Sequence, residues 1–204
     1  MKILVTAADS ALGTLLCQQL AREHDVVPIG RSETANVNRY ECLDLTNPEA
    51  VAKVLEGVET VVHAVPYTSE ESREQSEQEL LDWVSRSTYV LTTEACDAEV
   101  RRIVLLSTLD LMRSYDERYI VTNDWQPRPR ASADALAPHM AELVGREIAR
   151  TGKIEVITLR LGDIDVEVSE AEVIEAVTDA FDSELGAQYH WTVQHVASSG
   201  RFVR

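Results

Sequence analysis

The chain has few cysteines and no long apolar run, and each shortage excludes a class of protein. Its three cysteines, Cys17, Cys42 and Cys96, are widely spaced and form neither a CxxC pair nor a metal-binding pattern. We therefore expect buried thiols in a reducing compartment and no metal site. No apolar segment approaches the roughly 20 residues of a membrane helix, and no basic segment leads into an apolar one at the start. The sequence predicts a soluble, cytoplasmic protein with no membrane partner.

Positive charge is also scarce. The chain has 19 lysines and arginines against 35 aspartates and glutamates, which gives a net charge of −16. Such a charge repels nucleic acid and anionic lipid at long range, and no concentrated basic patch offsets it. Arg128 and Arg130 flank a proline, which is typical of a solvated loop. We expect no nucleic-acid partner, and we expect the acidic segments 70–79 and 167–184 to coat exposed helix faces.

The residues that are present alternate between short β-branched runs and longer helical periods. The 204 residues, 45% of them hydrophobic, suffice for one core, so we expect a single domain over 1–204. The alternation predicts an α/β fold, with parallel strands joined by crossover helices. The expected strands are 2–6, 25–29, one ending near 42–43, 59–64, 103–106, 154–161 and 187–196. The expected helices are 11–23, one beginning at 46–49, 74–98, 132–150 and 169–181.

Two local patterns add detail to this outline. Thr46 and Glu49 have the spacing of a capping box, with Pro48 early in the first turn of the helix. Segment 110–130 has weak periodicity and contains Trp125 and two prolines, so it is expected to be a long loop. Loops of this length in compact domains are usually functional or mobile.

The first stretch of the chain reads MKILVTAADSALG, an apolar run followed by small residues and a helical pattern. This order is typical of a dinucleotide-binding turn, in which three glycines allow a tight turn, close approach to the pyrophosphate and close helix packing. Here Ala7, Ser10 and Gly13 stand at that spacing. Ala7 fits if its φ stays negative. Ser10 either obstructs a phosphate or donates to it, and Ser10 or Asp9 can cap the helix.

Several segments carry a family resemblance in the right order: TAADSALG, Asp44-Leu45, VVHAV, VRRIVLLST and ITLRLGDI. Together they resemble the NAD(P)-dependent epimerase/dehydratase group of extended or atypical short-chain dehydrogenases. The resemblance implies a three-layer, doubly wound, Rossmann-like parallel sheet with NADP or NAD as cofactor. It also places a set of candidate cofactor-binding residues, namely Ala7, Ser10, Gly13, Arg31, Asp44 and His63.

The end of the second strand bears on which dinucleotide binds. An acidic residue there accepts a hydrogen bond from the ribose 2′-hydroxyl of NAD, whereas an arginine pairs with the 2′-phosphate of NADP. The residues are Gly30, Arg31 and Ser32. If a cofactor binds, we expect NADP over NAD; the alternative is that Arg31 is an exposed loop residue. Asp44 resembles the position that meets adenine, or it serves local turn chemistry.

The resemblance implies a catalytic hydroxyl after the fifth strand and a Tyr-xxx-Lys on the next helix, where lysine lowers the tyrosine pKa for proton transfer. Thr108 stands at the hydroxyl position as a remnant of this apparatus. Ala133 and Ala137 stand at the tyrosine and lysine positions. All three lysines of the chain lie elsewhere, and no tyrosine has a lysine four residues later.

Substitute acids or bases have to be weighed against simpler interpretations. Tyr115 and Tyr119 are candidates, but aromatic residues in a long loop commonly anchor it to the core. His139 follows a proline at an expected helix start. Asp110 and Glu142 have no partner that the sequence identifies, and Arg160, on a strand, is expected at most to pair with an acidic neighbour.

The sequence also departs from the family after Gly162-Asp163. A tyrosine, glycine and proline loop is implied there, whereas this sequence continues with Ile164 to Glu167; the C-terminal substrate lobe is not found before Arg204. We therefore expect a catalytically inactive member that serves as a dinucleotide-binding or protein-interaction module, with a homodimer through 74–98 and 132–150 as one form. The alternative is an NADP-dependent oxidoreductase or epimerase with a non-standard acid/base. A purely structural role is indicated if the protein's own side chains around Ser10 and Asp9 fill the pocket.

Overall fold

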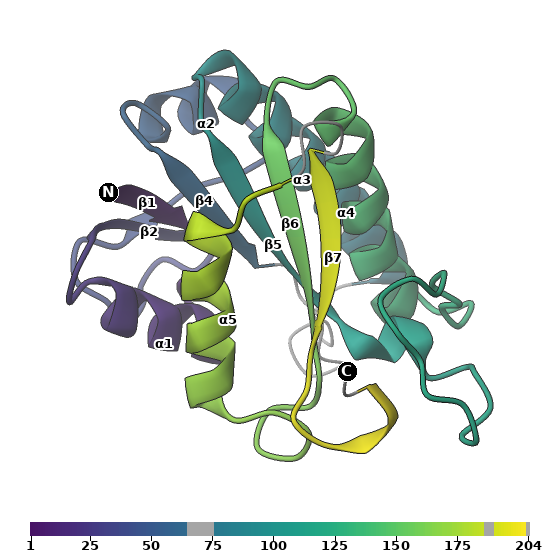
Figure 1. Cartoon of the computed structure of the whole chain (residues 1–204). Coiled ribbons are helices and arrows are strands. Elements are labelled where there is room, and N and C mark those ends of the chain that lie inside the picture. Colours follow the sequence, from purple (N-terminus) through teal and green to yellow (C-terminus); the bar gives the residue numbers. More distant parts are fainter. Residues whose placement is uncertain (65–75, 186–189, 203–204) are drawn as a thin grey trace.

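The computed structural model describes residues 1–64, 76–185 and 190–202, and the described strands form one parallel sheet (Figure 1). Its order is β3-β2-β1-β4-β5-β6-β7, so the chain winds outward in both directions from the pair β1 and β4. The strands are β1 (Lys2–Val5), β2 (Asp25–Gly30), β3 (Glu41–Cys42), β4 (Thr60–Ala64), β5 (Arg102–Thr108), β6 (Glu155–Leu161) and β7 (Trp191–Val196). This confirms the predicted Rossmann-like, doubly wound sheet.

Helices cover both faces of the sheet, which gives the three layers that the family resemblance implied (Figure 1). One face carries α1 and α5, and the other carries α2, α3 and α4. The bounds are α1 (Ala11–Leu20), α2 (Pro48–Val54), α3 (Glu77–Asp97), α4 (Ala133–Ala149) and α5 (Glu170–Asp182), with short 3₁₀ turns η1 (Leu109–Met112) and η2 (Gly200–Phe202). The helix start expected at 74 and the strand start expected at 187 lie outside the described residues.

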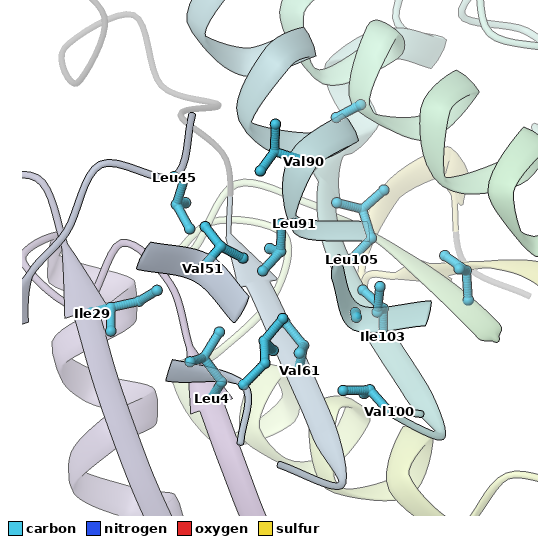
Figure 2. Packing of buried hydrophobic residues seen from close by; sticks show 14 of the residues in the cluster. Leu4, Ile29, Leu45, Val51, Val61, Val90, Leu91, Val100, Ile103 and Leu105 are labelled. Carbon is cyan, nitrogen blue, oxygen red and sulfur yellow. The ribbon is translucent and has the colours of Figure 1, made fainter. Parts of the chain in front are cut away.

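Each sheet face has its own apolar core because successive residues of a strand point to opposite faces. Leu4 and Val61 pack with Leu91 beneath α3 (Figure 2), whereas Ile3 and Val62 pack under α1 and α5. All of β4 and all of β5 are buried, as strands covered on both faces should be.

The helix starts differ from the sequence prediction in two places. Asn47, not Thr46, is the N-cap of α2, because the Thr46 hydroxyl already donates to Asp44 Oδ1 over 2.8 Å. The expected capping box of Thr46 and Glu49 is therefore wrong. Pro138 lies inside α4 rather than at its start, which is Ala133 after the N-cap Ser132.

The far end of α5 is completed by a buried arginine that the sequence did not single out. Arg102, at the start of β5, donates from its guanidinium to the carbonyls of Ala180 and Phe181, both over 2.6 Å. Its charge is balanced by Glu155 on β6, with Nη2 to Oε2 at 2.6 Å. A cation against the last carbonyls of a helix satisfies acceptors that the helix itself leaves open.

The segment after η1 is a packed loop rather than a free one. Tyr115 is buried and meets Trp125 edge-to-face, with ring centroids 4.7 Å apart. Arg201, in η2, donates to the carbonyl of Tyr115 over 2.6 Å and to that of Arg113 over 2.9 Å. Aromatic anchoring, one of the two interpretations of these tyrosines, describes Tyr115 well.

Within 1–64, 76–185 and 190–202, no helix is both long and apolar enough to cross a bilayer. The same residues contain no group of three or more histidines, cysteines or acidic residues arranged to hold a metal ion.

Candidate functional site

The turn between β1 and α1 lies where the winding of the sheet reverses, the usual place for a ligand in such folds. Ser10 is the N-cap of α1, and its Oγ accepts the Gly13 N–H over 3.0 Å. A Cβ on Gly13 would lie 2.0 Å from the carbonyl oxygen of Ala7, so only glycine allows this packing. Ser10 and Gly13 are thus built into the turn, and the hydroxyl proton of Ser10 is still available to a phosphate oxygen.

Ala7 adopts a backbone conformation that the sequence analysis did not expect. Its φ is +48°, in the left-handed region, so the condition under which an alanine fits without strain, a negative φ, is not met. A side chain in that region costs about 1–2 kcal/mol relative to glycine, because Cβ crowds the following carbonyl. The first glycine position of the turn therefore keeps its glycine-type conformation and carries the strain of an alanine.

Asp9 closes the end of β2. Its Oδ2 accepts two successive backbone N–H groups, those of Arg31 over 3.0 Å and Ser32 over 2.8 Å. A Cβ on Gly30 would lie 2.2 Å from Asp9 Oδ1, so the carboxylate occupies space that only a glycine leaves open. The Tyr40 hydroxyl donates to the Ser32 carbonyl over 2.6 Å, and burial together with the charge of Asp9 raises the pKa of Tyr40 to about 12.

Beside this strand end lies a cavity of about 580 Å³ between the β3 end and α3. The Arg31 guanidinium lies over the ring of Trp83, 4.4 Å from its centroid, in a cation–π contact. Asp44 Oδ1 accepts the backbone N–H of Thr46 over 2.9 Å, and this bond lowers the pKa of Asp44. The lining residues are Arg31, Cys42, Leu43, Asp44, Thr46, Glu79, Asp82, Trp83 and Arg86. Asp44 therefore performs the turn chemistry that was one of its two interpretations, and it still borders the cavity.

His63 is buried in the core and, like the turn residues Ala7, Ser10 and Gly13, does not line this cavity. Its side chain is 0% exposed, with Nδ1 2.9 Å from Thr6 Oγ1 and Nε2 3.0 Å from Thr88 Oγ1. Burial lowers the pKa of His63 to about 4, so the imidazole is neutral. It joins β1, β4 and α3 inside the core.

At the end of β5, both hydroxyls of the expected catalytic motif bond within the protein. Thr108 Oγ1 accepts the Asp110 N–H over 3.1 Å and caps η1. Ser107 Oγ donates to Glu142 Oε1 over 2.6 Å. Glu142 in turn holds Arg160 through two bonds, Nε to Oε1 at 2.9 Å and Nη2 to Oε2 at 2.7 Å, and both side chains are buried. Arg160 thus pairs with an acidic neighbour as expected.

Helix α4 carries neither tyrosine nor lysine, and Ala133 and Ala137 are buried in the core beneath α3 and α4. Of the substitute candidates, Tyr115 donates its hydroxyl proton to the Gln126 carbonyl over 2.8 Å. Tyr119 is 51% exposed, and its ring contacts that of Trp125 in a tilted arrangement. His139 is half-buried, and burial lowers its pKa; its Nδ1 has no hydrogen-bond partner among the described residues.

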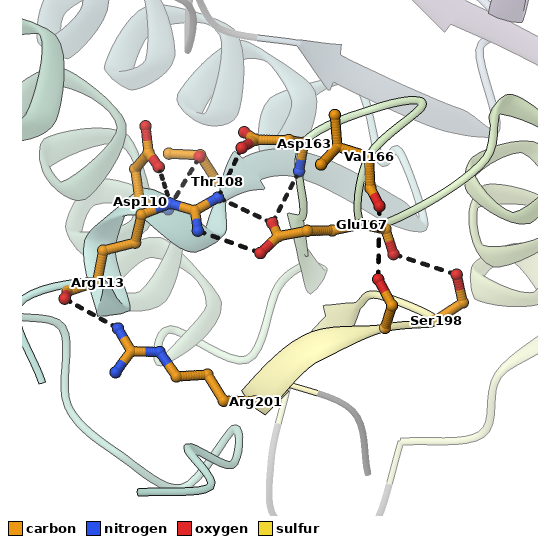
Figure 3. A network of polar contacts seen from close by, with 9 residues as sticks. Thr108, Asp110, Arg113, Asp163, Val166, Glu167, Ser198 and Arg201 are labelled. Atoms are coloured by element: carbon orange, nitrogen blue, oxygen red, sulfur yellow. Dashed lines mark hydrogen bonds and ion pairs between the residues drawn. The ribbon is translucent and has the colours of Figure 1, made fainter. Parts of the chain in front are cut away.

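A second polar network joins the carboxyl ends of β5, β6 and β7 (Figure 3). Arg113 binds Glu167 through two bonds, at 2.8 and 3.1 Å, and also pairs with Asp110 and with Asp163 over 3.0 Å. The Glu167 carbonyl accepts the Ser198 N–H over 2.9 Å. The prediction that Glu167 coats an exposed helix face is therefore wrong, since it precedes α5 and faces Arg113. The hydrogen bonds to Glu167 raise the pKa of Arg113. Burial acts to raise the pKa of Glu167, but the bonds and charge of Arg113 outweigh it and hold that pKa below its ordinary value.

The sequence missed the partners of these acids. Asp9 is 22 residues from Arg31, Glu142 is 18 from Arg160, and Arg113 is 54 from Glu167. No local spacing links such pairs. The available signal was that Asp9, Arg113, Arg160 and Glu167 lie at or a few residues beyond the end of an expected strand, where the ends of parallel strands meet. Glu142 lies inside an expected helix and carried no such signal.

Comparison with known proteins gives one curated relative and many similar structures. The L-arabinose 1-dehydrogenase (NAD(P)(+)) of Haloferax volcanii is 26% identical over 174 residues, which cover 79% of this chain and 66% of that protein. The chain thus spans just under two thirds of that relative's length.

The similar structures extend over almost the whole chain. Uronate dehydrogenase from Agrobacterium tumefaciens is 20% identical, with a TM-score of 0.79, covering 97% of this chain and 77% of its own. UDP-glucose 4-epimerase from Thermotoga maritima is 15% identical, with a TM-score of 0.80 and the same coverage. MoeE5, solved in complex with UDP-glucuronic acid and NAD, is 20% identical, with a TM-score of 0.79, and covers 97% and 76%. At these identities the structures show the shared fold.

A family model supplies the classification. The model described as "NAD dependent epimerase/dehydratase family" matches residues 3–165, well over half of the chain. The matched region runs from within β1, through the turn before α1 and the pair of Glu142 with Arg160, to the loop after β6. The chain therefore belongs to the NAD-dependent epimerase/dehydratase family.

Proposed function

We propose that this family member has lost the proton-transfer step and serves as a dinucleotide-binding module. The observation that carries the proposal is that α4 has no tyrosine or lysine, and that Ala133 and Ala137 pack into the core instead. Hydride transfer to or from a carbonyl needs a positioned acid or base to exchange a proton with the oxygen. Without such a group, a bound nicotinamide has no partner for turnover.

The remaining polar groups near the β5 end support the same conclusion. Ser107 is buried and bonded to Glu142, and Thr108 caps η1. Arg160 and Glu142 satisfy each other in the interior. Ser107, Glu142 and Arg160 would each have to leave an existing partner before acting on a substrate, whereas the Thr108 hydroxyl accepts the Asp110 N–H and keeps its proton.

Three features support retained binding of a dinucleotide. Ser10 begins α1 at the switch point of the sheet, so the helix N-terminus is placed to attract a pyrophosphate. The cavity of about 580 Å³ beside β2 and β3 borders Asp44, at the position implied to meet adenine. The family and the solved MoeE5 complex support NAD as the ligand, and the name of the Haloferax volcanii relative includes both NAD and NADP.

The test is calorimetric titration of the purified chain with NAD, NADP, NADH and NADPH, followed by absorbance assays with sugars, sugar acids and nucleotide sugars. We expect micromolar binding of at least one dinucleotide, about −8 kcal/mol, and no turnover. Turnover above the cofactor-only background would favour the alternative, an oxidoreductase or epimerase with a non-standard acid/base such as His139. No binding at millimolar cofactor would leave a purely structural or protein-binding role.

We also propose that the module works in the cytoplasm and pairs through α3 and α4. The described cysteines are free thiols, as a reducing compartment favours. Tyr89 on α3 is 56% exposed and Leu143 on α4 is 36% exposed, so these helices present apolar side chains outward. Light scattering of the purified chain, with Tyr89→Glu as the variant that should shift a dimer to a monomer, tests the pairing.

A further inference from the structure

We infer that Asp9 makes the dinucleotide site select a nucleotide with a free ribose 2′-hydroxyl over one with a 2′-phosphate. The inference rests on the proposed dinucleotide-binding function and names the ligand class of that site. It reverses the sequence-based expectation of NADP, which depended on Arg31.

The first step is the position of the carboxylate. Two successive backbone N–H groups that converge on one point form an anion site, and at the β2 end this point is Asp9 Oδ2. A dinucleotide site has its ribose recognition at this same strand end. The Asp9 carboxylate thus occupies the position at which a 2′-phosphate would accept these two N–H groups.

The second step is that this placement is built into the surrounding structure. Gly30 has no Cβ, which would otherwise lie 2.2 Å from Asp9 Oδ1. The Ala8 N–H donates to the Ile29 carbonyl over 2.9 Å and fastens the turn to β2. The Tyr40 hydroxyl holds the Ser32 carbonyl on the far side. Asp9 is therefore fixed against the strand end by contacts on several sides.

The third step concerns the ligand. A 2′-phosphate brings about −1.5 to −2 charges at neutral pH, which Asp9 repels at contact distance. A 2′-hydroxyl is neutral and can donate its proton to a carboxylate oxygen. Asp9 thus supplies, from the turn, the acidic group that an NAD site needs at the end of β2, where the strand itself has only Gly30, Arg31 and Ser32.

The fourth step removes the basis for expecting NADP. The Arg31 N–H donates to Asp9, while its guanidinium lies over the Trp83 ring of α3. Arg31, Trp83 and Asp44 line the same cavity, next to the end of β3. To pair with a 2′-phosphate, Arg31 would have to leave the indole and approach a strand end that Asp9 already occupies.

The experiment compares NADH and NADPH affinities of the full chain by calorimetry, at one fixed salt concentration, for wild type, Asp9→Asn and Asp82→Asn. Asparagine keeps an oxygen that can accept both N–H groups but removes the charge. Asp82 is exposed, lines the same cavity from α3, and controls for a general loss of negative charge. Circular dichroism verifies that each variant is folded.

We expect wild type to favour NADH and Asp9→Asn to shift the affinity ratio toward NADPH by about tenfold, equal to about 1.4 kcal/mol. Asp82→Asn should leave the ratio near that of wild type. A wild type that favours NADPH, or an Asp9→Asn ratio equal to the wild-type ratio, overturns the inference.

Failure of the proposed function gives different results. Turnover by wild type would overturn the proposed inactivity and leave the affinity ratios to decide the role of Asp9. No binding by wild type, with NADPH binding gained in Asp9→Asn, would overturn the inference as well as the dinucleotide module, because Asp9 would then exclude both nucleotides. No binding by wild type or by Asp9→Asn would overturn both.

Discussion

The two halves of the sheet treat the polar residues at their strand ends in opposite ways. Around β1, β2 and β3, Ser10, Asp44 and Arg31 border an open turn and a cavity of about 580 Å³. Around β5, β6 and β7, the polar residues bind one another, as Glu142 does Arg160 and Glu167 does Arg113. The comparison shows that a strand-end position alone does not make a residue available to a ligand.

This difference between the two halves of the sheet predicts that different residues control nucleotide binding and stability. A buried ion pair such as Glu142 with Arg160 contributes little net stability over an apolar replacement, but losing one partner strands a charge in the interior. Variants of the C-terminal half should therefore affect folding, and variants of the N-terminal half should affect nucleotide affinity. The variants below test whether stability and nucleotide affinity depend on different halves, in order of decreasing expected effect.

The largest effect is expected from Glu142→Ala. It leaves the buried Arg160 without its carboxylate and Ser107 without its acceptor, and should lower the free energy of unfolding by about 3–5 kcal/mol. Urea denaturation measures it. Combining Glu142→Ala with Arg160→Met should recover part of the loss. A matching loss of NADH affinity in folded protein would contradict the dependence on different halves, because it would place this pair at the nucleotide.

Ala7→Gly should raise the free energy of unfolding by about 1 kcal/mol, because glycine accepts the positive φ at this position without strain. Combined with Ser10→Gly, it should also tighten dinucleotide binding if Cβ atoms at the turn limit the approach of the pyrophosphate. Urea denaturation and calorimetry give the two values. Unchanged affinity in the double variant would place the limit on binding elsewhere.

The Arg113 network should make stability depend on acid. Because Arg113 holds the pKa of Glu167 below its ordinary value of 4.5 in the folded state, the pair stabilises the protein above that pH. This contribution is lost as pH falls through 4.5 toward the lower, folded-state pKa. Arg113→Gln should cost about 1 kcal/mol at neutral pH and less at low pH. Denaturation at several pH values tests this, and a pH-independent difference between the variants would contradict it.

The smallest effect is expected from Arg31→Ala. If the guanidinium serves the Trp83 contact rather than a 2′-phosphate, NADH and NADPH affinities should fall together, each by about 1 kcal/mol or less. Calorimetry with both nucleotides measures this. A selective loss of NADPH would mean that Arg31 reads the phosphate after all, and would restore the expectation drawn from the sequence.

The sequence predicted the sheet, its order of elements and its layers, because hydrophobic periodicity and the βα turn are local signals. It predicted the cap of α1 at Ser10 or Asp9, and the structure selects Ser10. It did not predict the sign of φ at Ala7, because the identity of the residues in this turn does not by itself decide between a negative and a positive φ. It named Asp9 but not its donors, because the N–H groups of Arg31 and Ser32 meet it only through the pairing of β1 with β2.

Other differences have equally physical causes. His63 stood in a family motif, but the hydroxyls of Thr6 and Thr88 satisfy both of its nitrogens inside the core. Thr46 had the spacing of a cap, but Asp44 took its hydroxyl and Asn47 capped α2 instead. Neighbouring side chains compete for the same donors and acceptors, and the outcome depends on three-dimensional distances.

The contact of Arg102 with the end of α5 has a consequence for the order of folding. The last carbonyls of α5 find their donor in a side chain 78 residues earlier in the chain, so docking onto β5 stabilises this turn in addition to its local hydrogen bonds. A peptide spanning 169–183 should fray at its end, whereas in the folded protein the amides of the last turn of α5 should exchange with solvent only when α5 separates from β5. Their exchange rate therefore reports how often α5 separates from the sheet.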